Sequence, residues 1–184
     1  ILLSENKDKY LSKNNLNFKR IDLIRSILPN SSFLIPIREP LQNAYSLLSQ
    51  HLHFSQLQKK DDFIRRYMNY LGHNEFGLSH KSWNKPVKFK ELNDINYWLE
   101  QWYLFYKFIY DKFQFYENCY FVIYEELNNA KYIEKILEII DLKNNKIINL
   151  DYFINSNKKK ISVEYDEDNY KKATSIYNSF INSK

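Results

Sequence analysis

An arginine and a serine eight positions apart are the side chains in this sequence best suited to holding a phosphate. Arg38 directly follows a short apolar run, Phe33–Ile37, and Ser46 lies a few residues beyond a proline, Pro40. A guanidinium presents a planar fork of N–H donors that matches two phosphate oxygens, and a serine hydroxyl adds a further donor. The pair can bind a phosphate only if the backbone brings both side chains to one point.

The residues around this pair predict a strand, a sharp turn and a helix. Phe33–Ile37 has the length and apolar character of a strand buried on both faces. Pro40 keeps Glu39 out of the helical region and is favoured at the first position of a helix. The next segment, 41–52, repeats apolar residues at helical spacing.

This order of elements predicts where an anion would bind. Arg38 would lie at the carboxyl end of a strand, where open α/β sheets bind ligands. Free backbone N–H groups and the dipole at the start of the next helix would favour the same anion. On spacing alone, the alternative stays open and is the commoner one: Arg38 in an ordinary ion pair and Ser46 without a ligand.

Composition is typical of a single domain that spans residues 1–184. Hydrophobic residues make up 44% of the chain, which suffices for a core, and the formal net charge of +5 suits an anionic ligand. The same charge would suit nucleic acid, but the basic residues are scattered and are expected to form a solvated surface. The only cysteine, Cys119, excludes an intrachain disulfide and a cysteine-based zinc site.

Nothing in the sequence predicts insertion into a membrane or export. No apolar run approaches the ~18 residues of a membrane-spanning helix, and no signal peptide is visible, so a cytoplasmic location is expected. The sequence begins at Ile1 and its only methionine is Met68. We therefore expect an N-terminal segment to be missing.

Several segments, in chain order, resemble the sulfotransferases that use 3′-phosphoadenosine 5′-phosphosulfate (PAPS). Arg38-Glu39-Pro40 with Ser46 is similar to the 3′-phosphate-binding motif of that family, in which an arginine ends a strand and a serine eight residues later lies on the next helix. Lys13-Asn14-Asn15 and Pro29-Asn30-Ser31-Ser32-Phe33 are similar to the run that precedes this motif in the family. Three later segments are similar to bacterial-type members: Glu75-Phe76-Gly77, Trp98-Leu99 with Trp102, and Tyr124-Glu125-Glu126-Leu127.

The resemblance implies a helix-rich α/β fold: a small parallel sheet flanked by helices, of the P-loop NTPase-like sulfotransferase type and truncated at its N-terminus. Strands are expected at Phe33–Ile37, at Cys119–Tyr124 and just before Lys13. The implied reaction transfers a sulfuryl group from PAPS to a hydroxyl or amine and releases 3′-phosphoadenosine 5′-phosphate (PAP). By resemblance, Arg38 and Ser46 bind the 3′-phosphate, Lys13 steadies the leaving oxygen, and Glu125 braces a turn.

The sequence departs from the family pattern in three respects. The family places a glycine-rich phosphosulfate loop ahead of these segments, whereas Gly72 and Gly77 are the only glycines here. Cytosolic members carry a histidine as general base at the position of Asn15, which cannot accept a proton. Late basic residues that cover the 3′-phosphate would be Lys158, Lys159 and Lys160, without the matching glycine. We therefore expect this chain alone to bind PAP weakly and to have little activity.

Other functions remain open from the sequence. His73, Glu75 and His80 are of metal-ligating types, but sulfuryl transfer needs no metal, and a loop on the substrate side is expected instead. The two alternatives to a sulfotransferase are a P-loop kinase-like nucleotide-dependent transferase and a non-catalytic basic helical module that binds nucleic acid. We favour a protein without a nucleic-acid partner. The acceptor could be a saccharide, a lipid, a tyrosine or a small metabolite.

Overall fold

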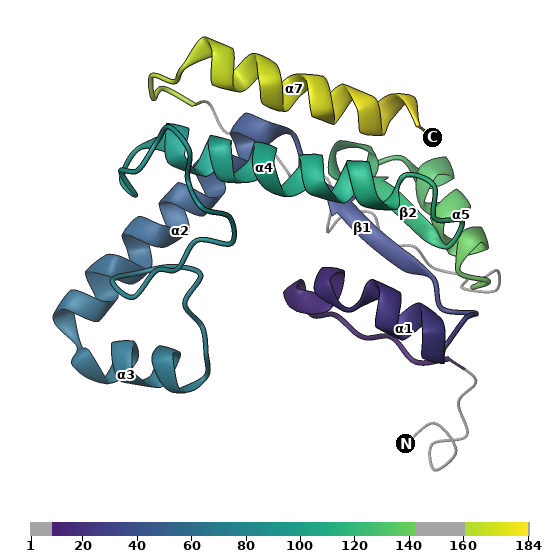
Figure 1. Cartoon of the computed structure of the whole chain (residues 1–184), viewed down its shortest axis with the longest axis horizontal. Coiled ribbons are helices and arrows are strands. Elements are labelled where there is room, and N and C mark those ends of the chain that lie inside the picture. Colours follow the sequence, from purple (N-terminus) through teal and green to yellow (C-terminus); the bar gives the residue numbers. More distant parts are fainter. Residues whose placement is uncertain (1–8, 143–160, 184) are drawn as a thin grey trace.

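Two strands far apart in the sequence form a sheet in the part of the protein that the structure describes. A computed structural model describes residues 9–142 and 161–183 of the chain. In this part, β1 (Phe33–Ile37) pairs in parallel with β2 (Cys119–Ile123), with Phe33 opposite Cys119 and Ile37 opposite Ile123. Helices flank the pair, so the described chain is a helix-rich α/β protein with a small parallel sheet (Figure 1).

The helices differ widely in length, and the two longest carry much of the core. In chain order they are η1 (Asn15–Lys19), α1 (Ile21–Ile27), α2 (Pro40–Lys60), α3 (Asp62–Tyr70), α4 (Ile95–Phe113), η2 (Tyr124–Glu126), α5 (Ala130–Ile139) and α7 (Glu167–Asn182), where η marks a 3-10 helix.

Side-chain caps define where several of these helices begin. Asp94 accepts a hydrogen bond from the Asn96 N–H at 2.9 Å and starts α4, while Asp166 accepts one from the Asn169 N–H at 2.8 Å and starts α7. A short polar side chain of this kind satisfies backbone donors that have no partner within the helix. The caps therefore set the boundaries of both helices.

The core forms where α4 meets α2 and α7. One face of α4 is buried, α2 crosses that helix, and α7 lies along it (Figure 1). Phe180 of α7 joins these layers to the sheet, because its ring lies 4.7 Å from the ring of Phe121 in β2 and 5.1 Å from that of Tyr110 in α4. The long aromatic face of α4 is thus core, as its helical spacing indicates.

Two of the three predicted strands are confirmed, but β1 is not buried on both faces as predicted, because Leu34 is 37% exposed and Pro36 is exposed as well. The second ends at Ile123, one residue earlier than predicted, because Tyr124 begins the 3-10 turn η2. The strand predicted just before Lys13 is wrong for the described residues: residues 9–14 have no regular structure, and Leu11 is 90% exposed. A strand in a parallel sheet needs a hydrogen-bonded neighbouring strand and at least one covered face, and residues 9–14 have neither.

Within residues 9–142 and 161–183, the helices are either too short or too polar to cross a lipid bilayer.

The loop between α3 and α4 is held against α2 by buried polar groups. The Gly77 N–H donates to Nδ1 of His51 at 3.3 Å, and the Leu78 N–H donates to Oε1 of Gln58 at 2.7 Å. Nε2 of His80 lies 2.7 Å from the Tyr97 hydroxyl, and Nδ1 of the same ring lies 2.7 Å from the Glu75 carbonyl oxygen. These contacts give a loop without regular structure a defined path.

The two glycines of this loop give a matched test of its packing. Both have positive φ, 74° at Gly72 and 85° at Gly77, so alanine is strained at either. An added Cβ at Gly72 meets no atom within 4 Å, whereas at Gly77 it would overlap the Gln58 side-chain amide. That amide is buried and accepts from the Leu78 N–H, so it can move aside only by losing this hydrogen bond. We expect Gly72→Ala to cost about 1 kcal/mol of unfolding free energy and Gly77→Ala about 2–3 kcal/mol, measured by urea denaturation. Equal costs would contradict the close packing at Gly77.

Two histidines at this loop make the free energy of unfolding depend on pH, and we expect it to fall in mild acid. Burial lowers the pKa of His51 and of His80 from 6.5, and the neighbouring His80 lowers that of His51 further. The folded state therefore binds fewer protons than the unfolded state below pH 6.5, so the free energy of unfolding falls as the pH falls through that value. Protonation at Nδ1 of His51 would also remove the acceptor of the Gly77 N–H.

Melting temperatures at pH 7.5 and 5.5 measure this effect, and the wild-type protein should melt at a lower temperature at pH 5.5. In His51→Asn the amide oxygen can replace Nδ1 as an acceptor without titrating, so its melting temperature should change less with pH. His53→Gln, at an exposed position of α2, is the control and should behave as wild type. The lowered pKa values of Asp22 and Asp166 act in a separate window, below about pH 4.

Candidate anion-binding site

The carboxyl ends of the two strands place an arginine against a tyrosine. Arg38 and Tyr124 directly follow Ile37 and Ile123, which are opposite one another in the parallel register. The Cζ atom of Arg38 lies 5.0 Å from the centre of the Tyr124 ring, a cation–π contact. Arg38 is half-buried, and within the described ranges no carboxylate forms an ion pair with it.

Two carboxylates lie at the same end of the sheet, and both accept hydrogen bonds from other groups. Glu125 accepts from the Glu39 N–H at 2.9 Å and from the Tyr177 hydroxyl at 2.8 Å. Glu39 accepts from the Tyr170 hydroxyl at 3.1 Å and from the Gln42 N–H at 2.7 Å. We call Glu39, Glu125, Tyr170 and Tyr177 the carboxylate network. Through it, Glu125 braces the turn after β1, in agreement with its predicted structural role.

The electrostatics of this network keep its tyrosines protonated. Burial raises the pKa of Tyr177, and the hydrogen bond to Glu125 raises it further. Burial, followed by the charge of Glu39, likewise raises the pKa of Tyr170. Tyr106, whose hydroxyl donates to the Pro36 carbonyl oxygen at 3.0 Å, also has its pKa raised by burial and then by Glu125. The Tyr170 and Tyr177 hydroxyls therefore act as fixed donors to the two carboxylates, and the Tyr106 hydroxyl as a fixed donor to the backbone of β1.

The start of α2 differs from what the sequence predicts. Free backbone N–H groups were expected there, but Pro40 has none and the Gln42 N–H already donates to the Glu39 carboxylate. The Asn43 N–H donates to the Glu39 carbonyl oxygen at 2.9 Å. The expectation of several free N–H groups at this terminus is wrong, because Glu39 caps the Gln42 N–H of its own helix and leaves only the Leu41 N–H of the first turn without a hydrogen bond among the described residues. At this edge, affinity for an anion must come mainly from side chains.

The other predicted site residues are not linked to Arg38 within the described chain. Ser46 is half-buried and lies two residues after the buried Ala44 in α2, roughly 200° around the helix from it, so it is not on the face that Ala44 packs into the core. Lys13 is exposed in the segment before η1. No hydrogen bond between described residues joins Lys13, Arg38 or Ser46 to one another. Lys158, Lys159 and Lys160 lie outside the described residues.

Metal ligation by the loop histidines has no support in this structure. Over residues 9–142 and 161–183, no three histidine, cysteine or acidic side chains gather as a metal site would require. His73 Nδ1 lies 3.6 Å from a carboxylate oxygen of Glu75, while both ring nitrogens of His80 have other partners.

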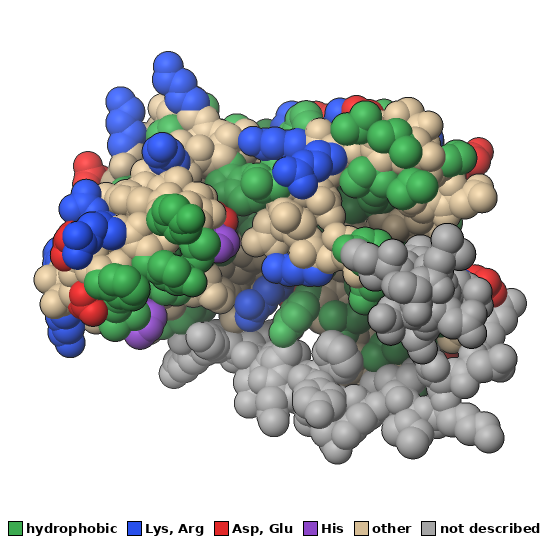
Figure 2. Space-filling model, turned by 90° about the horizontal axis from the view of Figure 1, so that it is seen from below, with side chains coloured by type: hydrophobic (Ala, Val, Ile, Leu, Met, Phe, Trp, Pro, Cys, Tyr) green, Lys and Arg blue, Asp and Glu red, His purple; other side chains and the backbone are tan. Residues whose placement is uncertain are grey.

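The basic side chains do not form the surface expected of a nucleic-acid-binding module on the face seen in Figure 2. There the Lys and Arg side chains of the described residues lie in separate groups, with hydrophobic and uncharged surface between them. Proteins that bind nucleic acid through backbone phosphates present a basic patch or stripe. This face shows neither.

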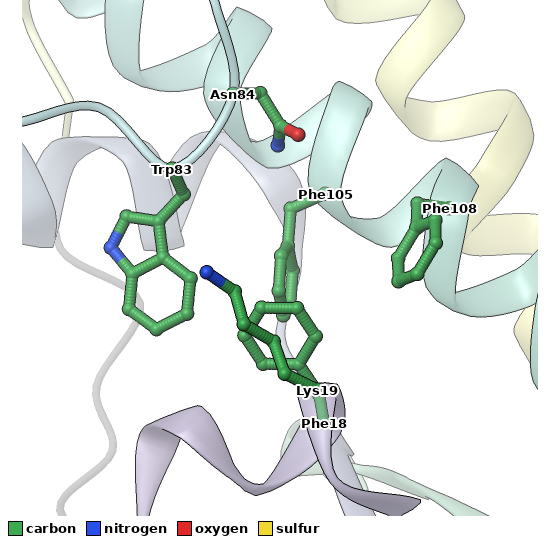
Figure 3. Close-up of a pocket in the computed structure, with 6 residues that line it drawn as sticks. All are labelled: Phe18, Lys19, Trp83, Asn84, Phe105 and Phe108. Atoms are coloured by element: carbon green, nitrogen blue, oxygen red, sulfur yellow. The ribbon is translucent and has the colours of Figure 1, made fainter. Parts of the chain in front are cut away.

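A second candidate site escaped the sequence analysis. A pocket of about 190 Å³ opens between η1, the loop before α4, and α4, lined by Phe18, Lys19, Trp83, Asn84, Phe105 and Phe108 (Figure 3). The local signal was a tryptophan in a polar, lysine-rich loop, Lys81–Lys85. Sequence alone could not show that this tryptophan meets Phe18.

No known protein-family model matches the chain, and neither does any curated protein or solved structure.

Proposed function

We propose that this protein is a sulfotransferase that moves a sulfuryl group from PAPS to a hydroxyl or amine acceptor, with Arg38 binding the 3′-phosphate of the nucleotide. The parallel strands flanked by helices are compatible with this function, and the arginine at the carboxyl end of β1 supports it. The acceptor is a saccharide, a lipid, a tyrosine or a small metabolite in this proposal.

One observation carries the proposal. Arg38 is half-buried beside two carboxylates, yet the hydrogen bonds of Glu39 and Glu125 come from tyrosine hydroxyls and backbone N–H groups. Partial burial of a charge is costly unless it is compensated. The Tyr124 ring compensates only part of that cost, which leaves the guanidinium available to an external anion such as a phosphate.

The chain's own residues would contribute mainly position and charge. When bound, PAPS supplies the sulfuryl group, and the chemistry resembles phosphoryl transfer, in which positioning and stabilisation of spread negative charge supply most of the catalysis. In the proposal, Arg38 and Ser46 orient the nucleotide and Lys13 offsets negative charge at the leaving oxygen. No described residue is proposed as general base.

The direct test is calorimetric titration of PAP into wild type and Arg38→Ala. Loss of hydrogen bonds to a charged group costs about 1.5–3 kcal/mol, so we expect binding to weaken roughly 10- to 100-fold. Arg38→Lys should recover only part of the loss, because an ammonium cannot bind two oxygens as a fork does.

Arg25→Ala is the matched control for this test. Arg25 also lies over a tyrosine ring, with Cζ 4.0 Å from the centre of Tyr116, but in α1 and not at the end of a strand. PAP affinity should stay within twofold of wild type. An equal loss of PAP affinity in both variants would mean that only the net charge of the protein matters, and would refute a 3′-phosphate site at Arg38. Tighter binding of ATP than of PAP would favour the kinase-like alternative, and salt-sensitive oligonucleotide binding insensitive to Arg38→Ala would favour the nucleic-acid module.

A further inference from the structure

The pocket beside α4 brings together three segments that are distant in the sequence. Phe18 and Lys19 come from η1, Trp83 and Asn84 from the loop before α4, and the last two lining residues from α4 itself (Figure 3). None of these residues belongs to the carboxylate network, and Arg38 does not line the pocket. The pocket and the proposed nucleotide site therefore share no residue.

Aromatic rings form the walls of this pocket and hold one another in place. Phe18 stacks on Trp83 with ring centres 5.2 Å apart and an interplanar angle of 28°. Phe105 stands edge-on to both, at 5.0 Å from Phe18 and 5.8 Å from Trp83. Offset-stacked and edge-to-face arrangements are those that aromatic rings prefer, so the walls offer preformed surfaces to another flat ring.

A cation and an amide lie at the same pocket. Lys19 Nζ is 5.7 Å from the Phe18 ring centre and 6.0 Å from that of Trp83, and Figure 3 shows it directed between Trp83 and Phe105. No carboxylate of the described ranges forms an ion pair with Lys19. The Asn84 side chain lies at the upper side of the pocket, and its backbone N–H donates to Oε1 of Gln101 at 3.2 Å, which holds this part of the loop on α4.

We infer that the pocket binds a single aromatic ring that carries one anionic group. A cavity of 150 Å³ lined by apolar side chains holds benzene, so about 190 Å³ suits one six-membered ring with a small substituent. The ring would pack against Phe18, Trp83 and Phe105, and its anionic group would contact Lys19. Asn84 can donate a second hydrogen bond to that group.

The lining disfavours two other classes of ligand. A saccharide would bring several hydroxyl groups to a pocket whose lining side chains offer only Lys19, Asn84 and the Trp83 indole N–H as polar groups, and hydroxyls that lose water without a partner are costly to bury. A cationic ligand would lie close to the Lys19 ammonium in the same pocket, and like charges repel. An aromatic carboxylate matches both the rings and the single cation.

Titration with benzoate, followed by the indole N–H resonances of the three tryptophans, tests the inference. Trp98 and Trp102 are only 4% and 2% exposed, so Trp83 alone should shift, with saturation. Benzyl alcohol, which has the ring but no charge, should bind roughly tenfold more weakly than benzoate, as expected for loss of one hydrogen bond to a charged group. Glucuronate should bind more weakly than benzoate.

Lys19→Gln should weaken benzoate binding roughly tenfold and leave benzyl alcohol binding unchanged, because it removes the charge and keeps the half of the aliphatic stem nearest the backbone. Lys85→Gln, at an exposed position two residues from Trp83, makes the same change in net charge and should alter neither affinity. Both lysines are exposed, so both variants should fold, which circular dichroism would verify. The inference is overturned if Trp83 does not shift, if benzyl alcohol binds as tightly as benzoate, if glucuronate binds more tightly, or if the two variants behave alike.

Discussion

Phe180→Ala is expected to lower the free energy of unfolding by about 3–5 kcal/mol, the range for truncation of a fully buried phenylalanine. Phe180 is 0% exposed, and its ring meets Phe121 of β2 and both Tyr106 and Tyr110 of α4. The substitution would leave a cavity at the junction of α7, α4 and the sheet. Three packed elements cannot all move to fill it, so little of the loss can be recovered by relaxation.

Urea denaturation monitored by circular dichroism would measure this loss. Phe115→Ala is the matched control, because Phe115 is 84% exposed and should change the free energy of unfolding by no more than about 0.5 kcal/mol. A loss below 1 kcal/mol in Phe180→Ala would mean that α7 does not pack on α4 and β2 as described.

Glu125→Ala is expected to cost about 3 kcal/mol of unfolding free energy. The substitution removes the acceptor of two donors, the Glu39 N–H and the Tyr177 hydroxyl. Hydrogen bonds to a charged group contribute about 1.5–3 kcal/mol each, and the loss is less than their sum because the two bonds share one carboxylate. Glu117→Ala, at an exposed position before β2, is the control and should be nearly neutral.

Two further variants separate the charge of Glu125 from its hydrogen bonds. Glu125→Gln keeps one oxygen acceptor for the Glu39 N–H, so it should cost less than Glu125→Ala. Tyr177→Phe removes the second donor, so Glu125→Ala should cost less in that background than in wild type, as groups in direct contact require. Additive costs would show that Tyr177 and Glu125 do not interact. On the proposed function, Glu125→Ala should also weaken PAP binding, because it loosens the turn that carries Arg38.

Local pattern explains why the elements around the candidate site were predictable. Five consecutive apolar residues before Arg38 form β1, and Pro40 begins α2 as the conformational restriction on proline indicates. A continuous apolar run likewise predicted β2. In α4, periodicity over many residues identified the buried side of the helix. In these segments, short-range geometry and burial favour the same structure.

The capping of α2 could not be predicted from the neighbouring residues alone. The sequence predicted an open helix terminus because the first N–H groups of a helix lack partners within it. Glu39 could cap those groups, accept from Tyr170 or pair with Arg38, and all three uses are compatible with its position in the chain. In the folded protein Glu39 caps the Gln42 N–H and accepts from Tyr170, and no ion pair joins it to Arg38 among the described residues. The packing of α7 beside the strands decides this, because it brings the Tyr170 and Tyr177 hydroxyls to the two carboxylates.

The sequence by itself determined the strand–turn–helix unit, the position of Arg38 at the end of β1 and the apolar face of α4. Tertiary structure alone decided that Arg38 lies over Tyr124, that the neighbouring carboxylates are satisfied by tyrosines of α7, and that Phe18 meets Trp83 at a pocket. The physical reason is range: dihedral preferences and hydrophobic periodicity act over a few residues, whereas these contacts join residues that only the packed chain brings together.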